Sequence, residues 1–125
     1  MIRAVGTDVV DHDHFTEVLS KSSPGFIEHL FTRREVEYCE RFKSRTASYA
    51  AIFAAKEAFL KALRTGLARG IRWTDVEVLH EESGAPSIRA HGRAAELLGD
   101  GRAHVSLSHS RNTAHAVVVI EDHLP

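Results

Sequence analysis

The feature that most constrains this chain is a run of residues with helical periodicity, which predicts a helix over residues 46–65. Its centre reads Tyr49-Ala-Ala-Ile-Phe-Ala-Ala-Lys-Glu-Ala-Phe-Leu-Lys-Ala-Leu63. The large apolar residues recur three and four positions apart, so on a helix they form one stripe that must be buried against another element. We expect Gly66 to end the helix, because a glycine there can adopt the left-handed conformation.

Three charged residues interrupt or flank this apolar stripe. Lys56 falls inside it, Glu57 lies on its edge, and Lys61 follows Glu57 by one helical turn. A charge among apolar residues is costly unless it is paired, bound to a metal or placed in a cleft. One interpretation is a Lys56 that reaches to solvent beside a surface Glu57–Lys61 pair. The other is a cleft in which a carboxylate and two ammonium groups meet a charged ligand.

The remaining patterns predict an α+β fold in a single domain over residues 1–125, with a small, mainly antiparallel sheet packed against the long helix. Thr32 and Glu35 have capping-box spacing and predict the start of a helix that reaches about residue 42. The last strand is apolar on both faces, which favours a central position in the sheet. The other expected elements are strands at 2–10, 72–79, 87–91, 103–109 and 114–121, and helical segments at 13–20, 26–31 and 94–98.

Composition excludes several classes of protein. The formal net charge is −1 and no aromatic-basic platform occurs, so nucleic-acid binding is not expected. No apolar run is long enough to span a bilayer, and residues 1–15 lack the pattern of a signal peptide, so we expect a soluble cytoplasmic protein without a membrane partner. Cys39 is the only cysteine and rules out an internal disulfide; its charged surroundings indicate a half-buried helix residue.

An acidic residue at the end of the first strand is the best candidate for a metal ligand. Ile2, Ala4, Gly6 and Asp8 share one face of that strand, and the face is small and apolar up to Asp8. The alternative role for Asp8 is to cap the next helix, but Asp11 is better placed for that. Asp8 and Glu57 would offer two hard oxygen ligands, and a two-carboxylate magnesium site predicts a phosphorylated substrate.

Polar and basic residues elsewhere leave alternatives open. His109 ends a strand beside Ser108 and is either a half-buried histidine or a phosphate or nucleotide contact. Lys43 and Arg45 belong to a basic cluster before the long helix that also contains Arg33, Arg34 and Arg41. Because glutamates alternate with this cluster, it is either a solvated face or a binding site for an acidic partner or a nucleotide phosphate. The Asp11-His-Asp-His14 segment lacks zinc-ligand spacing and indicates a solvated helix start.

Three segments together resemble holo-(acyl carrier protein) synthase, the small bacterial class of 4′-phosphopantetheinyl transferases. These segments are Val5-Gly-Thr-Asp-Val-Val10, Phe53-Ala-Ala-Lys-Glu-Ala-Phe-Leu-Lys-Ala-Leu63 and His104-Val-Ser-Leu-Ser-His109. The resemblance runs almost the whole length of the chain in the right order. It implies transfer of the phosphopantetheine arm of coenzyme A to a serine of an apo acyl carrier protein, with Mg²⁺ or Mn²⁺, by a cytoplasmic homotrimer with a cleft at each subunit interface.

The resemblance also implies roles for individual residues. Asp8 and Glu57 would hold the metal and, with Lys61, form the catalytic set. The residues implied in coenzyme A binding are Lys43, Arg45, Lys56, Lys61, Ser108 and His109. A carboxylate or a metal-bound water would take the serine proton. The chain departs from the family pattern at Ile52, His14 and Gly25, where family members often carry a basic residue. This departure suggests a carrier less acidic than the usual fatty-acid one, for example from a polyketide pathway.

Two rival functions share these residues. A metal-dependent phosphohydrolase of coenzyme A or nucleotides would use the same carboxylates without a carrier protein. A non-catalytic subunit that binds coenzyme A would need no metal. The pair of carboxylates argues against the second rival, because a module that only binds a polyanion gains nothing from two further negative charges.

Overall fold

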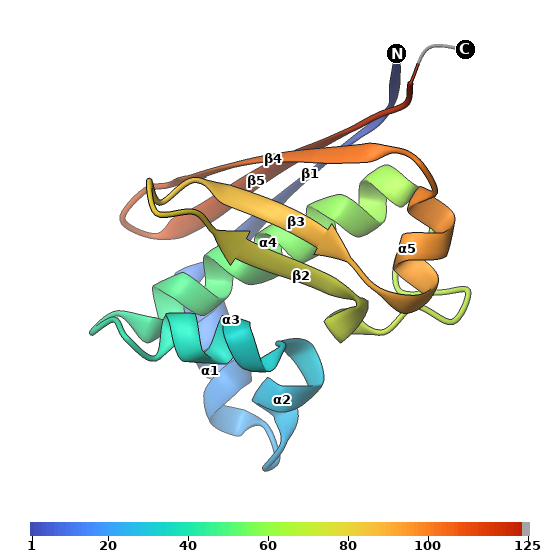
Figure 1. The fold of residues 1–125 in the computed structure, drawn as a ribbon. Helices are drawn as coiled ribbons and strands as arrows, with labels where there is room; N and C mark the ends of the chain where they lie inside the picture. Colours follow the sequence, from blue (N-terminus) through green and yellow to red (C-terminus); the bar gives the residue numbers. More distant parts are fainter. Residues whose placement is uncertain (124–125) are drawn as a thin grey trace.

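A computed structural model describes residues 1–123 and confirms the expected α+β class (Figure 1). One long helix, α4, lies among the strands and the shorter helices, and the first and last strands pair side by side, so that residue 1 lies close to residue 122. The elements are β1 (Ile2–Asp11), α1 (His12–Lys21), α2 (Phe26–Leu30), α3 (Arg33–Cys39), α4 (Arg45–Leu63), the 3₁₀ turn η1 (Trp73–Asp75), β2 (Val76–His80), β3 (Pro86–Ala90), α5 (Gly92–Leu98), β4 (Arg102–His109) and β5 (Thr113–Glu121).

The strands form two antiparallel sheets rather than the single sheet expected. The larger has the order β1-β5-β4, and the smaller is the β2-β3 hairpin. The apolar β5 occupies the centre of the larger sheet, which confirms the prediction made from its composition. In its register with β1, Asp8 lies opposite Ala116 and Asp11 opposite Thr113. Asp8 therefore lies towards the end of β1 that leads into α1.

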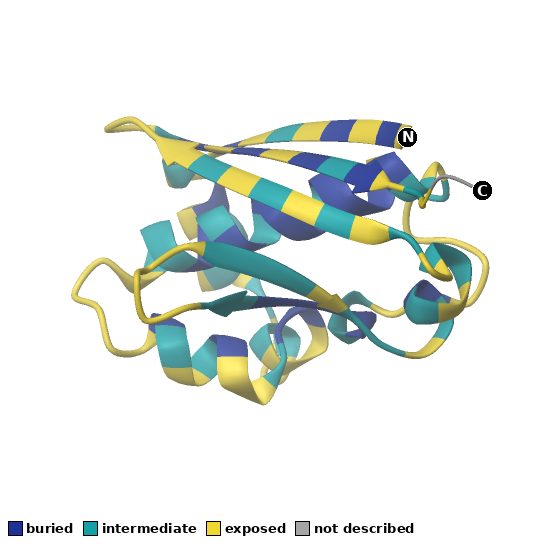
Figure 2. Ribbon diagram, turned by 45° about the horizontal axis from the view of Figure 1, so that its top comes forward, coloured by how far each residue is buried: buried dark blue, intermediate teal, exposed yellow. Residues whose placement is uncertain are grey.

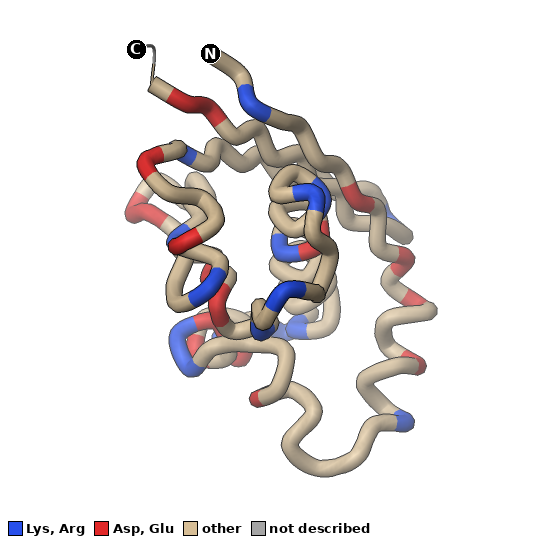
Figure 3. The backbone as a smooth tube through the Cα atoms, turned by 90° about the vertical axis from the view of Figure 1, so that its right-hand side faces the viewer, with Lys and Arg blue, Asp and Glu red and all other residues tan. Residues whose placement is uncertain are grey.

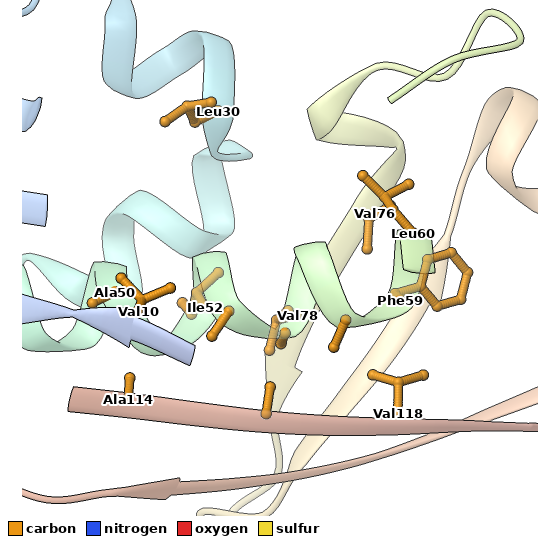
Figure 4. Packing of buried hydrophobic residues seen from close by; sticks show 14 of the residues in the cluster. Val10, Leu30, Ala50, Ile52, Phe59, Leu60, Val76, Val78, Ala114 and Val118 are labelled. Carbon is orange, nitrogen blue, oxygen red and sulfur yellow. The ribbon is translucent and has the colours of Figure 1, made fainter. Parts of the chain in front are cut away.

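Helix α4 fills the space between the two sheets, where its small residues allow close packing. Ala50, Ala54, Ala55 and Ala58 are completely buried, and Phe59 and Leu60 complete the core with β-strand residues such as Val78 and Val118 (Figure 4). The approach of β1 to α4 is closest at Gly6, where a Cβ atom would lie 1.9 Å from the carbonyl oxygen of Ala58. Glycine is required there because any side chain would separate β1 from α4.

Several element boundaries differ from the sequence predictions. The capping box of Thr32 and Glu35 is present, but α3 ends at Cys39 because its chain turns before the start of α4. Helix α4 ends at Leu63, and Arg64 rather than Gly66 takes the left-handed capping conformation, with φ of 63°. Residues 73–75, expected to be part of a strand, form η1.

One face of the larger sheet is left uncovered, because α4 packs only against the other. Exposed and buried residues alternate along its strands (Figure 2). The uncovered face carries apolar side chains, with Val5 55%, Val9 56% and Val117 36% exposed. No helix within residues 1–123 is long and apolar enough to cross a membrane.

Candidate active site

Asp8 and Glu57, the two predicted metal ligands, line one cavity of about 690 Å³. Strand β1 supplies Asp8 and helix α4 supplies Glu57, so the close packing of these two elements brings the carboxylates to the same site. Helices α1 and α2 and the turn η1 also line the cavity, with apolar residues such as Phe15, Phe26 and Trp73 beside His14 and His29. The sequence prediction that distant residues 8 and 57 share a site therefore matches the geometry.

Lys61 binds one of the two carboxylates. Its ammonium group lies 3.0 Å from Oδ1 of Asp8 and donates to the carbonyl oxygen of Thr7 at 2.9 Å. The Asp8 side chain is 15% exposed, whereas that of Lys61 is 53% exposed. Lys61 is therefore attached to the site through Asp8, rather than through the surface pair with Glu57 that was one interpretation of the sequence, and it still has access to solvent.

The surroundings of Glu57 disfavour its negative charge. Burial raises the pKa of Glu57, the nearby charge of Asp8 raises it further, and Lys61 opposes these effects. A cation placed between the carboxylates would relieve their repulsion. Hard oxygen donors of this kind suit Mg²⁺ or Mn²⁺, which commonly take one or two carboxylates and fill the remaining positions with water and phosphate oxygens. Within residues 1–123 no cluster of three or more histidine, cysteine or acidic side chains is arranged for a metal.

A second cavity, of about 520 Å³, contains three of the residues predicted to contact coenzyme A. Lys43 lines it from the segment before α4, and Ser108 and His109 line it from the end of β4. Ile52, one of the departures from the family pattern, contributes to its floor. The residues that line this cavity and those that line the carboxylate cavity do not overlap. A single copy of the chain thus holds the predicted site residues in two separate groups.

Arg45, another of the six residues predicted to bind coenzyme A, forms an ion pair within its own chain. Its guanidinium group lies 3.1 Å from Oε2 of Glu40, and both side chains are substantially exposed. Glu40 also accepts a hydrogen bond of 2.7 Å from the hydroxyl group of the buried Tyr49. The exposed pair with Glu40 is weak enough for Arg45 to exchange partners when an anion approaches.

The structure corrects the prediction for Lys56. This side chain is completely buried, and its Nζ atom lies 2.7 Å from Oε1 of the equally buried Glu35. Nζ also donates to the carbonyl oxygens of Trp73 at 3.1 Å and Val76 at 2.5 Å. An ammonium group has only three protons. No donor remains for a phosphate of coenzyme A, and the alternative of a solvent-reaching lysine is equally inconsistent with complete burial.

The sequence predicted Glu35 only as a capping residue. The capping motif gave no sign that Glu35 also pairs with Lys56. Its Oε1 accepts from the backbone N–H of Thr32 at 2.8 Å, and its Oε2 accepts from the N–H of Val78 at 2.7 Å. Burial raises the pKa of Glu35 and lowers the pKa of Lys56, while their mutual attraction opposes both shifts. The only hint in the sequence was Lys56 itself, because pairing with a carboxylate is one of the ways in which a lysine in an apolar stripe is stabilised.

Two further expectations concern α1 and the cysteine. Asp11 caps α1 by accepting from the backbone N–H of His14, as its position predicted. Cys39 was expected to be half-buried but is fully buried at the end of α3. Burial, and then the charges of Glu35 and Glu40, raise the pKa of the Cys39 thiol to about 12, so it is not a nucleophile at neutral pH.

Known proteins match this chain both in sequence and in overall fold. The sequence pattern of the 4′-phosphopantetheinyl transferase superfamily matches residues 4–119. The chain belongs to this superfamily. A holo-(acyl-carrier-protein) synthase of Geobacter metallireducens is 44% identical over 124 residues, which cover 97% of this chain and 98% of that protein. The family recognised from the residues alone is thereby confirmed.

Solved structures of the family have the same fold. The holo-(acyl-carrier-protein) synthase of Bacillus anthracis, crystallised in complex with CoA (3′,5′-ADP), has a TM-score of 0.84 and 30% sequence identity, and the match covers 98% of this chain and 99% of that one. The Neisseria meningitidis synthase has a TM-score of 0.87 and 29% identity, with 98% of this chain and 100% of that chain covered. The α+β fold is therefore the fold of these synthases.

Proposed function

We propose that this chain transfers the 4′-phosphopantetheine moiety of coenzyme A to a serine of an apo acyl carrier protein, with Asp8 and Glu57 as the ligands of a divalent metal. The observation that carries this proposal is the pair of carboxylates on one cavity, with Lys61 bound to Asp8, in a chain of the phosphopantetheinyl transferase superfamily. Two carboxylates beside one exposed ammonium group are suited to a metal-bound pyrophosphate, because neither the acidic pair nor the lysine alone would hold one.

The chemistry follows from charge. When bound, Mg²⁺ or Mn²⁺ supplies positive charge that stabilises the pyrophosphate and its developing leaving group. Lys61, held by Asp8 and Thr7, adds a second positive charge at the same cavity. The carrier serine oxygen attacks the β-phosphorus, the bond to the bridging oxygen breaks, and adenosine 3′,5′-bisphosphate leaves. The serine proton passes to a carboxylate of the site or to water.

We propose that coenzyme A binds residues from both cavities and that neighbouring subunits of a homotrimer supply them. Lys43, Ser108 and His109 lie on one cavity and the carboxylates on the other. The uncovered face of the β1-β5-β4 sheet exposes a row of valines, and an apolar patch of this kind is typical of a subunit interface. Assembly would bury this face and bring Lys43 and Arg45 of one subunit towards the nucleotide held by the next.

The charge of α1 supports the hypothesis that the carrier is less acidic than a fatty-acid carrier. His14 lines the carboxylate cavity, which places α1 beside the site that the acceptor serine must reach. Acidic residues predominate along α1 and its N-cap, with Asp11, Asp13 and Glu17 against the single Lys21 (Figure 3). A strongly acidic partner would be repelled there. The test compares transfer rates on an acidic fatty-acid carrier and on a less acidic carrier. An equal or higher rate on the acidic fatty-acid carrier would contradict this hypothesis.

Mass spectrometry of the carrier tests the central proposal. Purified protein is incubated with coenzyme A, Mg²⁺ and an apo carrier protein, and the carrier is expected to gain about 340 Da, the mass of the arm. Asp8→Asn and Glu57→Gln are each expected to abolish this gain. Asp11→Asn is the matched control, because it removes a neighbouring carboxylate at the same cavity while asparagine caps a helix equally well.

The same experiment separates the rival functions. Release of free phosphopantetheine without any gain by the carrier would favour a phosphohydrolase. Binding of coenzyme A that needs no metal and yields no product would favour a non-catalytic subunit. Neither rival is supported by the relatives described above, all of which are synthases. The cytoplasmic location expected from the sequence remains a prediction.

A further inference from the structure

The buried Glu35–Lys56 pair lies outside the two cavities and has no part in the chemistry proposed above. Its members come from α3 and α4, and both side chains are 0% exposed. Every proton of the Lys56 ammonium group has an acceptor in Glu35, Trp73 or Val76, and both oxygens of Glu35 accept backbone hydrogen bonds. The pair therefore ties α3, α4, η1 and β2 together at one point.

Stability alone gives little reason for such a pair. Removing two charges from water costs several kcal/mol per ion, so a buried ion pair is often no more stabilising than apolar residues of the same volume. An ion pair differs from apolar packing in its directionality. The fixed angles of its hydrogen bonds determine how α4 is rotated about its axis and how far it lies from η1.

The rotation of α4 about its axis and its distance from η1 both affect the carboxylate cavity. Lys56 precedes Glu57 by one residue, which is about 100° around the helix. When Lys56 points towards η1 and β2, Glu57 points into the cavity. Trp73, whose carbonyl oxygen accepts a hydrogen bond from Lys56, also lines the cavity, and its ring centroid lies 5.0 Å from that of Phe53, another lining residue.

We propose that Glu35 and Lys56 are positioning residues that orient Glu57 and Trp73 around the metal cavity. This inference rests on the proposed function in taking Glu57 as a metal ligand. It assigns to Lys56 an indirect effect on catalysis in place of a contact with the phosphates. Loss of the pair should weaken metal binding and loosen the Trp73 wall, while the chemistry at saturating metal changes little.

The test uses the double variant Glu35→Gln/Lys56→Met, because Lys56→Met alone leaves a buried unpaired carboxylate and is expected to unfold the protein. Arg93→Gln/Glu96→Gln is the matched control, since it removes another ion pair of this chain, one on the surface. Trp73 is the only tryptophan, so the fluorescence emission of the metal-free protein reports directly on the cavity wall. Binding of Mn²⁺ alone is measured by titration, and transfer is measured as a function of Mg²⁺ concentration.

In the folded double variant we expect Trp73 emission at longer wavelength, Mn²⁺ binding weakened about tenfold or more, as for other residues that orient metal ligands, and kcat at saturating Mg²⁺ within a few-fold of the native value. Unchanged emission and Mn²⁺ affinity would overturn the proposal, as would a loss confined to the affinity for coenzyme A. If the native protein transfers nothing, the proposed function fails, but emission and Mn²⁺ binding still decide whether the pair positions the cavity.

Discussion

Replacing Gly6 with alanine tests how closely β1 must approach α4 for the site to form. A Cβ atom at this position would lie 1.9 Å from the carbonyl oxygen of Ala58 and 2.8 Å from the backbone nitrogen of Ala62. Both are backbone atoms of α4, so no side chain can rotate to make room. The strand itself must move, and Asp8, two residues further along the same face, moves with it.

The expected size of the effect follows from these distances. Carbon–oxygen contacts in proteins are seldom shorter than about 3.3 Å, so β1 must move by ~1.4 Å. Overpacking typically costs about 1–3 kcal/mol, and the rigid surroundings place this change near 3 kcal/mol. With an unfolding entropy of about 2.1 cal/mol/K per residue, a chain of 125 residues changes by about 0.26 kcal/mol per degree. The melting temperature should therefore fall by about 11 °C.

Thermal unfolding followed by circular dichroism measures this shift, at one protein concentration because assembly makes the melting temperature depend on concentration. Gly101→Ala is the matched control: its closest contact, at 2.7 Å, is the end of the Arg3 side chain, and its closest backbone contact, the carbonyl oxygen of Leu98, lies at 3.0 Å rather than 1.9 Å. The Gly6→Ala protein should also need more Mg²⁺ for half-maximal transfer, because Asp8 moves away from Glu57. A decrease in melting temperature of less than about 3 °C with normal transfer would refute the reasoning, as would an equal decrease in the control.

Three further outcomes are expected. Tyr49→Phe should destabilise the protein by about 1 kcal/mol at pH 7, because the Tyr49 hydroxyl group lowers the pKa of Glu40 below its usual 4.5. That contribution to stability is complete above pH 4.5 and is lost as the pH falls through the lowered pKa of Glu40. Urea unfolding should therefore show that the free energies of unfolding of the native and variant proteins converge in acid. A difference that stays constant with pH would contradict the hydrogen bond to the carboxylate. Cys39 should resist alkylation at pH 8 until the protein is unfolded, and rapid modification of the native protein would contradict its burial. Val117→Asp should yield monomers by light scattering and abolish transfer, whereas a fully active monomer would exclude a site shared between subunits.

Metal binding and coenzyme A binding, as proposed here, differ in whether they need assembly of several subunits. The carboxylate cavity, with Lys61 and the Glu35–Lys56 pair behind it, is complete within one chain. Metal binding should therefore survive dissociation of the proposed trimer. Lys43 and His109 lie on the other cavity, so binding of coenzyme A should not. Measuring Mn²⁺ and coenzyme A binding on the Val117→Asp protein would distinguish the two demands.

Local patterns in the sequence were sufficient to predict the long helix, a helix start and the candidate metal ligands of this protein. The periodicity of residues 49–63 predicts α4, because a helix repeats its faces every three to four residues whatever lies beside it. The Thr32 capping box is likewise a contact between residues three apart. Asp8 and Glu57 were recognisable as candidates because each is an acid at the edge of an otherwise apolar face.

Tertiary structure decided which distant residues meet. Lys56 within an apolar stripe was compatible with a snorkelling side chain, a phosphate contact or a buried pair, and only the packing of α3 against α4 selects Glu35 as its partner. The separation of Lys43 and His109 from the carboxylates was equally invisible, because it depends on how β4 and the segment before α4 lie around the helix. Periodicity shows which face of an element is buried. The partner on the other side depends on the angles and distances at which whole elements pack.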